Sequence, residues 1–405
     1  MAGVTREAKA GVERLPDRIS IGVLAAVFTG ELIEEVIEEA DAREVRYRRL
    51  PARLMVIFVL ACWLFMRSGY GLVMSKLADA HAVVGRGWGV WDVPTTGSIT
   101  KARVRLGTEP LTLLFDRVKG AKGTTATPGV FYRGLRVVSL DGFTLDLPDT
   151  TDNDARFGRP STAAGLPGPY PQLRAVVLAE AGTRSLLGAV FGGYHDGEQT
   201  LAARPGILGA LGPRMLMLAD RNFPSWRAWR DATATGADLL WRMSASFTLP
   251  VLGVLDDGTY LSELTPPRKK DGPAIPVRVL EYSVITENDH GERVSELFAL
   301  ATTLLDPHTA PAGELAALYH DRWQAETGIG DLKTTERGGP ETVLRSKTPE
   351  MVEQEFWAML CVYQALRHLI TQAAPPGLDP SRVSFTRALS AARDSTPRVL
   401  SPHST

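Results

Sequence analysis

The chain has 405 residues, of which 44% are apolar and 22% charged, a composition typical of a folded protein of two or three domains and not of a disordered one. The formal net charge is −1 and the isoelectric point is near 6.7, so no overall basic field indicates a nucleic-acid partner. Any binding of nucleic acid must therefore use local patches. The charged N-terminus lacks the apolar centre of a secretory signal, which favours a cytoplasmic location.

Residues 1–95 are expected to form a helical N-terminal domain. The apolar run Leu54–Met66 has about thirteen residues, whereas a membrane span needs roughly twenty, so it predicts a buried helix. Glutamates at 31–39 are followed by arginines at 43–53, which form either a solvated face or a contact with DNA backbone. Cys62 and Cys361 lie in apolar helical runs and are interpreted as buried thiols in a reducing compartment, without zinc or a disulfide.

The middle of the chain predicts an α/β core that is interrupted by a second β-rich segment. Residues 96–130 are turn-rich and are interpreted as a connector. Residues 131–226 alternate strand and turn signals and form the first part of the core. Residues 227–311 indicate a β-rich insertion, after which helices return in residues 312–375 as the second part of the core. Residues 376–405 are left as a C-terminal tail.

Two aspartates follow strands that are expected to be buried. Asp141 comes after LRVVSL, and Asp220 comes after MLMLA. In an open α/β sheet the strand ends line the crevice where ligands bind, so both carboxylates can converge on one metal site. Each has a simpler explanation, because Asp141-Gly142 is a common turn dipeptide and Asp220 could cap the following helix.

The segment YHDRWQAETGIGDLK, residues 319–333, carries Tyr319, Arg322, Glu326 and Lys333. On an α-helix these four positions fall within a stripe of about 60°. A carboxylate between two cations and a phenol suits a metal ion that holds a phosphodiester. The alternative is a solvated face with local ion pairs, since Arg322 and Glu326 have i,i+4 spacing. Gly328 and Gly330 weaken the helix prediction and could mark a kink or a close backbone approach.

With these residues in place, the chain resembles the DDE insertion-sequence transposases of the insertion element four type. Their signature Y-(2)-R-(3)-E-(6)-K is met in full by the four residues of the stripe. The Leu-Asp-Gly context of Asp141, the sequence DRNF that begins at Asp220, and VLRSKTPEMVEQEFWAMLCVYQALR also resemble the family. The N-terminal helices resemble its dedicated N-terminal domain, so the likeness covers most of the chain.

The resemblance implies an RNase H-like catalytic core with a β-strand insertion between the second Asp and the Glu. It implies that Asp141, Asp220 and Glu326 hold two Mg²⁺ ions, for which Mn²⁺ can substitute. Tyr319, Arg322 and Lys333 would contact DNA phosphate, and Arg221 and Trp323 are candidates for assisting them. The family's reaction is hydrolysis at transposon ends and strand transfer into target DNA, with terminal inverted repeats and target duplex as partners and a homodimer in the synaptic complex.

Three functions are compatible with these patterns. The first is an active cut-and-paste transposase, which the complete set of three acids favours. The second is a truncated or decayed relative that binds terminal repeats and inhibits transposition, which the short tail and neutral charge favour. The third is a host nuclease of the RNase H-like class, which explains the carboxylates but neither the N-terminal domain nor the stripe.

Overall fold

A computed structural model of the chain describes residues 21–46, 48–82, 93–161, 165–287, 293–330 and 343–396. The side chains of residues 78–82, 285–287, 293–295 and 322–330 lie outside this description. The chain divides into two compact units. The helical unit comprises residues 1–118, 350–366 and 386–405, and the sheet unit comprises residues 119–349 and 367–385.

The helical unit is built around α3 (Ala52–Leu64), of which every residue except Arg53 is buried. Its apolar side chains extend around the whole helix, as expected for a helix at the centre of a bundle. The other helices are η1 (Gly22–Ala26), α2 (Gly30–Glu39), α4 (Tyr70–Ala82), α5 (Thr96–Leu106), α6 (Glu109–Val118), the first part of α12 (Pro349–Ala373) and α13 (Phe385–Ser395). The helices predicted between residues 21 and 80 are therefore confirmed. None of the described helices is long and apolar enough to cross a lipid bilayer.

The interpretation of residues 96–130 as a turn-rich connector is wrong for most of its length. Residues 96–106 and 109–118 form α5 and α6, because each carries buried apolar side chains at helical spacing; Gly107 ends α5, and Pro110 stands in the first turn of α6, where proline is tolerated. The C-terminal segment also contains a helix. Within the helical unit, Arg393 of α13 donates a hydrogen bond to the carbonyl of Leu64, so this part of the chain is folded and not a simple tail.

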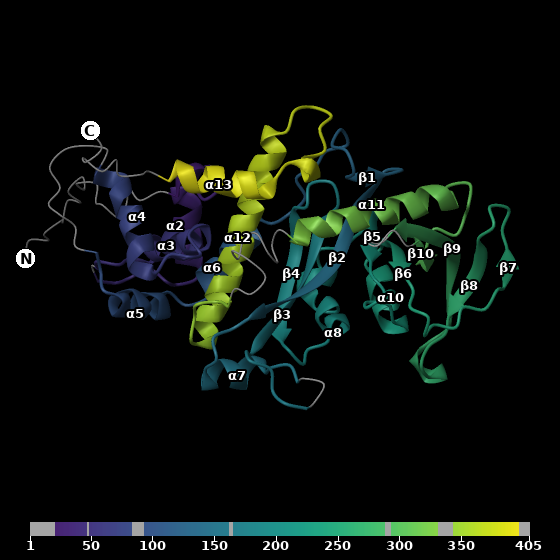
Figure 1. The fold of residues 1–405 in the computed structure, drawn as a ribbon, viewed down its shortest axis with the longest axis horizontal. Coiled ribbons are helices and arrows are strands. Elements are labelled where there is room, and N and C mark those ends of the chain that lie inside the picture. Colours follow the sequence, from purple (N-terminus) through teal and green to yellow (C-terminus); the bar gives the residue numbers. More distant parts are fainter. Residues whose placement is uncertain are drawn as a thin grey trace, which may run out of the picture. The chain divides into compact units, whose positions relative to one another are not determined.

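The sheet unit contains a mixed sheet whose strand order is β4-β3-β2-β5-β6-β10-β9-β8-β7, with β1 beside β2 (Figure 1). Strand β2 pairs antiparallel with β3 and parallel with β5, and β5 pairs parallel with β6. The strands are β1 (Phe131–Tyr132), β2 (Leu135–Asp146), β3 (Gln172–Glu180), β4 (Leu186–Gly193), β5 (Met215–Ala219), β6 (Asp238–Arg242), β7 (Gly253–Val254), β8 (Tyr260–Leu264), β9 (Ile275–Glu287) and β10 (Arg293–Thr302). This is the expected RNase H-like core of three antiparallel strands continued by two parallel ones.

Two separate apolar cores cover the two faces of this sheet. One face packs against α8 (Glu198–Ala202), α9 (Pro205–Leu208) and α10 (Trp226–Thr233), with Trp226 and Trp229 in its core. The other face packs against α11 (Ala312–Gly330), whose Leu315 and Tyr319 are buried there. The remaining elements are α7 (Thr151–Phe157) and the short helices η2 (Lys269–Asp271) and η4 (Pro380–Arg382). We call the face of the sheet that packs against α11 the α11 face.

The β-rich insertion begins later than the predicted residue 227. Helix α10 and strand β6 belong to the core, because β6 pairs parallel with β5 along four residues. The inserted strands β7 to β10 then extend the same sheet, since β10 pairs with β6 at one edge and β9 at the other (Figure 1). The insertion is therefore joined by backbone hydrogen bonds to β6, the strand next to β5.

Candidate catalytic site

Asp141 lies inside a continuous strand and not at a strand end or in a turn. Strand β2 runs without interruption through Asp141 and Gly142 and pairs with β3 as far as Asp146. Gly142 has a packing role: a Cβ atom at this position would lie 2.5 Å from the Oε1 atom of Glu198. The Asp-Gly pair therefore does not mark a hairpin, because β2 continues through it, and the Glu198 side chain occupies the space beside Gly142.

Asp220 directly follows β5 and is partly exposed. Its Oδ1 atom accepts a hydrogen bond of 2.9 Å from the backbone N–H of Asn222, which closes an Asx turn. The following helix α10 is capped by Ser225, whose hydroxyl accepts from the N–H of Ala228 at 3.1 Å. The explanation of Asp220 as a helix cap is therefore wrong.

Asp141 and Asp220 occupy corresponding positions on two neighbouring parallel strands. The β2–β5 pairing aligns Arg136 with Met215 and continues to Ser139 with Leu218. Continued for two residues past the end of this pairing, the same register would bring Asp141 of β2 opposite Asp220, which follows β5. Because neighbouring strands lie about 4.8 Å apart, this alignment brings the two acids close together.

The two aspartates also share a face of the sheet. Side chains alternate along a strand, and Val137 of β2 and Leu218 of β5 both belong to the core beneath α11. Asp141 lies four residues after Val137, and Asp220 lies two residues after Leu218. Both are even numbers of residues, so each aspartate is on the same face as the residue it is compared with. Both therefore fall on the α11 face, and Glu198, which approaches Gly142, lies on the opposite one.

Helix α11 is held against the end of β5 by Tyr319. This side chain is fully buried, and its hydroxyl donates a hydrogen bond of 3.2 Å to the carbonyl of Ala219, the residue before Asp220. The predicted contact between Tyr319 and DNA phosphate does not agree with this burial, since the phenol reaches the protein backbone and not solvent. In this structure Tyr319 fixes the helix beside Asp220.

The other members of the predicted stripe are less completely described. The backbone of α11 remains helical through Gly328 to Gly330, so the glycines do not end the helix before that point. The side chains of Arg322, Trp323 and Glu326, and all of Lys333, lie outside the described residues. Arg221, the last of the predicted phosphate contacts, is exposed immediately after Asp220.

Arg242 is a residue near the acids that has no local sequence motif. The β5–β6 pairing aligns Leu218 with Leu240 and Ala219 with Trp241, so its continuation places Arg242 opposite Asp220. The guanidinium is nearly buried, forms an ion pair with Glu296 and lies 3.8 Å from the centre of the Phe298 ring. The extended register thus places Asp141 of β2, Asp220 at the end of β5 and Arg242 of β6 in one row across the sheet.

The donor set fits a hard divalent cation. Asp141 offers carboxylate oxygens from strand β2 and Asp220 from the turn that follows β5, and Mg²⁺ prefers one or two carboxylates with water and substrate oxygens completing its shell. Among the side chains that the structure describes, no three potential ligands converge. Glu326, the third predicted ligand, is not among them.

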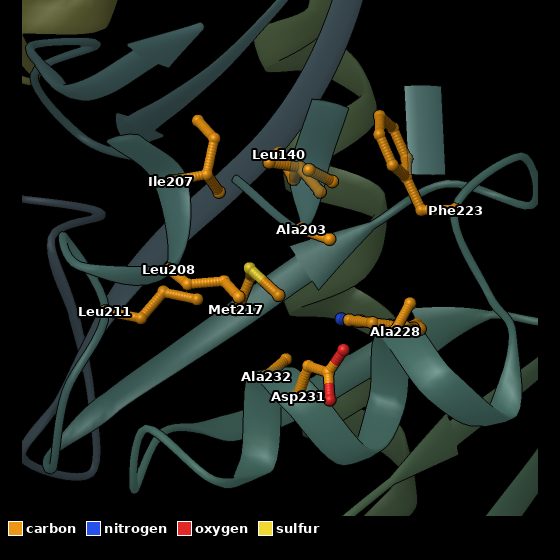
Figure 2. A pocket seen from close by; sticks show the side chains of 12 residues that line it. Leu140, Ala203, Ile207, Leu208, Leu211, Met217, Phe223, Ala228, Asp231 and Ala232 are labelled. Carbon is orange, nitrogen blue, oxygen red and sulfur yellow. The ribbon is translucent and has the colours of Figure 1, made fainter. Parts of the chain in front are cut away.

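A small pocket lies on the opposite face of the sheet and is a different feature. It is lined by apolar side chains such as Leu140, Ile207 and Met217, with Asp231 as the one carboxylate among the lining residues (Figure 2). Its volume of about 20 Å³ has room for about one water molecule. The pocket is therefore too small for a substrate, and we exclude it as the catalytic site.

A sequence profile described as "Insertion element 4 transposase N-terminal" matches residues 18–116, and one described as "Transposase DDE domain" matches residues 132–365, more than half of the chain. Transposase InsG for insertion sequence element IS4 of Escherichia coli (strain K12) is 29% identical over 374 residues, which cover 88% of this chain and 79% of that protein. Putative transposase InsZ of the same strain is 24% identical over 218 residues, which cover 53% of this chain and 68% of that one. A solved structure of the piggyBac transposase synaptic complex with hairpin DNA aligns with a TM-score of 0.46 at 9% identity, over 92% of this chain and 79% of that chain.

Proposed function

We propose, on the premise that this chain belongs to the DDE transposases with an insertion element 4 type of N-terminal domain, that it performs cut-and-paste transposition. In this proposal it cleaves DNA at the ends of an insertion sequence and joins the freed ends to target DNA. The observation that carries the proposal is the alignment of Asp141 with Asp220 on the α11 face, next to the helix that contains Glu326.

Asp141, Asp220 and Glu326 would hold two Mg²⁺ ions, with Mn²⁺ as a substitute. Bound cations of this kind lower the pKa of an attacking water and stabilise charge on the leaving oxygen. In the proposed cleavage step, a water oxygen attacks phosphorus, the bond from phosphorus to the 3′ oxygen breaks, and a free 3′ hydroxyl remains. In strand transfer that hydroxyl attacks a target phosphodiester and releases its 3′ oxygen.

Glu326 is assigned to the site from helix geometry. It follows Tyr319 by seven residues in α11, which is close to two helical turns, so both positions fall on one side of the helix. Tyr319 faces the end of β5, as its hydrogen bond to Ala219 requires. We propose that Glu326 completes the acid set from this side, with Arg322, Lys333 and Arg221 as contacts for DNA phosphate.

Terminal inverted repeats and target duplex are the proposed DNA partners, and a homodimer is the proposed assembly for synapsis. Local cations can provide backbone contacts despite the neutral net charge. In the helical unit Arg43 pairs with Glu34 at 2.6 Å and serves the fold, whereas Arg46 and Arg48 are exposed in the loop after α2. We propose that this loop contributes to DNA-end binding.

A cleavage assay tests the proposed function. The full chain is incubated with labelled DNA that carries the ends of its insertion sequence, with Mg²⁺, Mn²⁺ or EDTA. We expect metal-dependent nicking that Asp141→Asn, Asp220→Asn and Glu326→Gln each reduce by at least 100-fold. Asp231→Asn serves as the matched control, since this carboxylate lies by the pocket on the other face.

The outcomes separate the alternatives. Stable binding of the end sequence by the wild-type chain without any cleavage would overturn the proposal in favour of an inhibitor of transposition. Equal cutting of unrelated duplexes would favour a general nuclease. Activity that survives all three acid substitutions would show that the assigned carboxylates are not the metal ligands.

A further inference from the structure

Asp257 connects the inserted strands to the start of α11. It lies in the turn between β7 and β8, and its Oδ2 atom lies 2.5 Å from the Nη2 atom of Arg278. The same oxygen accepts a hydrogen bond of 3.3 Å from the N–H of Ala312, the first residue of α11. Its Oδ1 atom accepts from both the backbone and the hydroxyl of Thr259, at 3.2 Å and 2.6 Å. One carboxylate thus joins a hairpin of the insertion to the helix.

Arg278 of β9 also takes part in this connection between the insertion and α11. The side chain is fully buried, and its Nε atom donates to the hydroxyl of Thr259 at 2.8 Å. Its Nη1 atom donates to the carbonyls of Ala310 at 2.7 Å and Leu304 at 3.3 Å, both in the segment that leads from β10 into α11. Only a planar guanidinium can satisfy these directions together, because a lysine ammonium has no fixed fork.

The electrostatics of the pair favour a charged carboxylate at the helix start. Burial would raise the pKa of Asp257, but the hydrogen bonds from Thr259, the charge of Arg278 and the N–H of Ala312 outweigh it and lower this pKa. An anion at the N-terminus of a helix is stabilised by the helix dipole. Burying an arginine is costly unless it is fully hydrogen-bonded, and a buried ion pair is by itself weak evidence for added stability.

We infer that Asp257 and Arg278 are positioning residues for catalysis, which set the direction of α11 and hence the place of Glu326. This inference rests on the proposed function of Glu326 as a metal ligand. Asp257 and Arg278 hold the start of the helix, and Tyr319 holds its middle. Glu326 is seven residues beyond Tyr319, or about 10.5 Å along the helix, so a tilt of about 5° about that anchor moves it by nearly 1 Å.

A displacement of this size is large for a catalytic group. An error of about 1 Å in the placement of a reacting group can reduce a rate on the order of 100-fold. Under this inference the β-rich insertion acts on the catalytic site mechanically, through its contact with the helix start, without any of its residues touching metal or DNA there.

The test compares Arg278→Lys and Asp257→Asn with a matched control on the same turn of α11. Arg133 forms two hydrogen bonds with Glu314, at 2.8 Å and 2.7 Å, but both side chains are exposed. The control is therefore Arg133→Gln, which removes an exposed contact to this helix turn. Binding of Mn²⁺ to the full chain is measured by titration calorimetry, well below the thermal midpoint of each variant, alongside DNA cleavage and DNA affinity.

We expect Arg278→Lys and Asp257→Asn to weaken Mn²⁺ binding by at least fivefold and to slow cleavage by at least tenfold, with DNA affinity unchanged. Arg133→Gln should stay within twofold of the wild type in all three measurements. In a Glu326→Gln background, adding Arg278→Lys should change Mn²⁺ binding by less than twofold. A general loss of stability would not produce this dependence on Glu326.

The inference and the proposed function fail in different ways. If Glu326→Gln leaves Mn²⁺ binding and cleavage unchanged, the proposed role of Glu326 is wrong. If Glu326→Gln weakens both, while Arg278→Lys and Asp257→Asn bind Mn²⁺ like the wild type, the inference alone is overturned. If Arg278→Lys does not fold, Asp257→Asn decides the question. This substitution replaces only one carboxylate oxygen with an amide nitrogen, in a side chain that is more exposed than Arg278.

Discussion

The hydroxyl of Tyr319 donates a hydrogen bond to the carbonyl of Ala219, the residue that directly precedes Asp220, over a distance of 3.2 Å. Through this bond the helix that carries Glu326 is connected to the strand that carries the second aspartate. The contact gives a buried aromatic side chain a positioning role where a direct contact with DNA was predicted.

Tyr319→Phe separates these two roles. Loss of one buried hydrogen bond should lower the free energy of unfolding by about 1 kcal/mol, measured by urea denaturation. DNA affinity should remain within twofold, because the phenol does not reach solvent. Tyr260→Phe is the control, since it removes an exposed hydrogen bond to Glu281, and it should cost less than about 0.5 kcal/mol. A large loss of DNA affinity in Tyr319→Phe would instead support the predicted contact between Tyr319 and DNA phosphate.

The lowered pKa of Asp257 predicts a pH-dependent stability. Because the pKa is lower in the folded than in the unfolded chain, the charged carboxylate contributes fully above about pH 4 and the contribution is lost as the pH falls further. The difference in unfolding free energy between the wild type and Asp257→Asn should therefore be constant from pH 5 to pH 7 and shrink below pH 4. A difference that stays constant down to pH 2.5 would contradict a lowered pKa.

The two cysteines should be unreactive in the folded protein. Cys62 and Cys361 are both buried, and neither forms a disulfide. Burial, with the charge of Asp116 as a smaller cause, raises the pKa of the Cys361 thiol, so little thiolate is present at neutral pH. We expect a disulfide reagent such as DTNB to label neither thiol at pH 7.5 and both in 6 M guanidinium. Rapid labelling of the folded chain would show that one of these helices opens.

Gln354 should be important for the stability of the helical unit. Its side-chain amide donates to the carbonyls of Arg103 and Gly107, each at 2.8 Å, and its oxygen accepts from Arg103 at 3.1 Å. Gln354→Ala should lower the unfolding free energy by roughly 3 kcal/mol, because it removes three hydrogen bonds, two of them to buried groups of Arg103 and one to the part-buried carbonyl of Gly107. Gln372→Ala, on an exposed position of the same helix, should change it by less than about 0.5 kcal/mol. Equal effects of the two substitutions would contradict this role of the Gln354 side chain.

Local sequence patterns were sufficient for many of the elements and insufficient for their pairing. The runs before Asp141 and Asp220 predict strands because apolar residues there are continuous and β-branched or aliphatic. The alignment of the two acids depends on hydrogen bonds between strands that are far apart in the chain, for which neither run contains a signal. Arg242 was missed for the same reason.

Turn-forming residues caused the main errors in the sequence-based predictions. The turn-rich composition of residues 96–130 suggested a connector, although two helices, α5 and α6, occupy most of this segment. Asp141-Gly142 suggested a turn, although the glycine accommodates Glu198 within a strand. Asp257-Gly258 does lie in a turn, but its pattern cannot indicate that the aspartate also binds Arg278 and the start of α11, since that contact is made between distant segments.

The most direct measurement of the central claim is a crystal structure of the full chain with Mn²⁺, with the ion located by its anomalous scattering. We expect a peak at about 2.1 Å from carboxylate oxygens of both Asp141 and Asp220, with Glu326 completing the shell. The peak should disappear in Asp220→Asn and remain in Asp231→Asn. An active, Mn²⁺-saturated protein with no peak between Asp141 and Asp220, or with its metal bound elsewhere, would contradict the account.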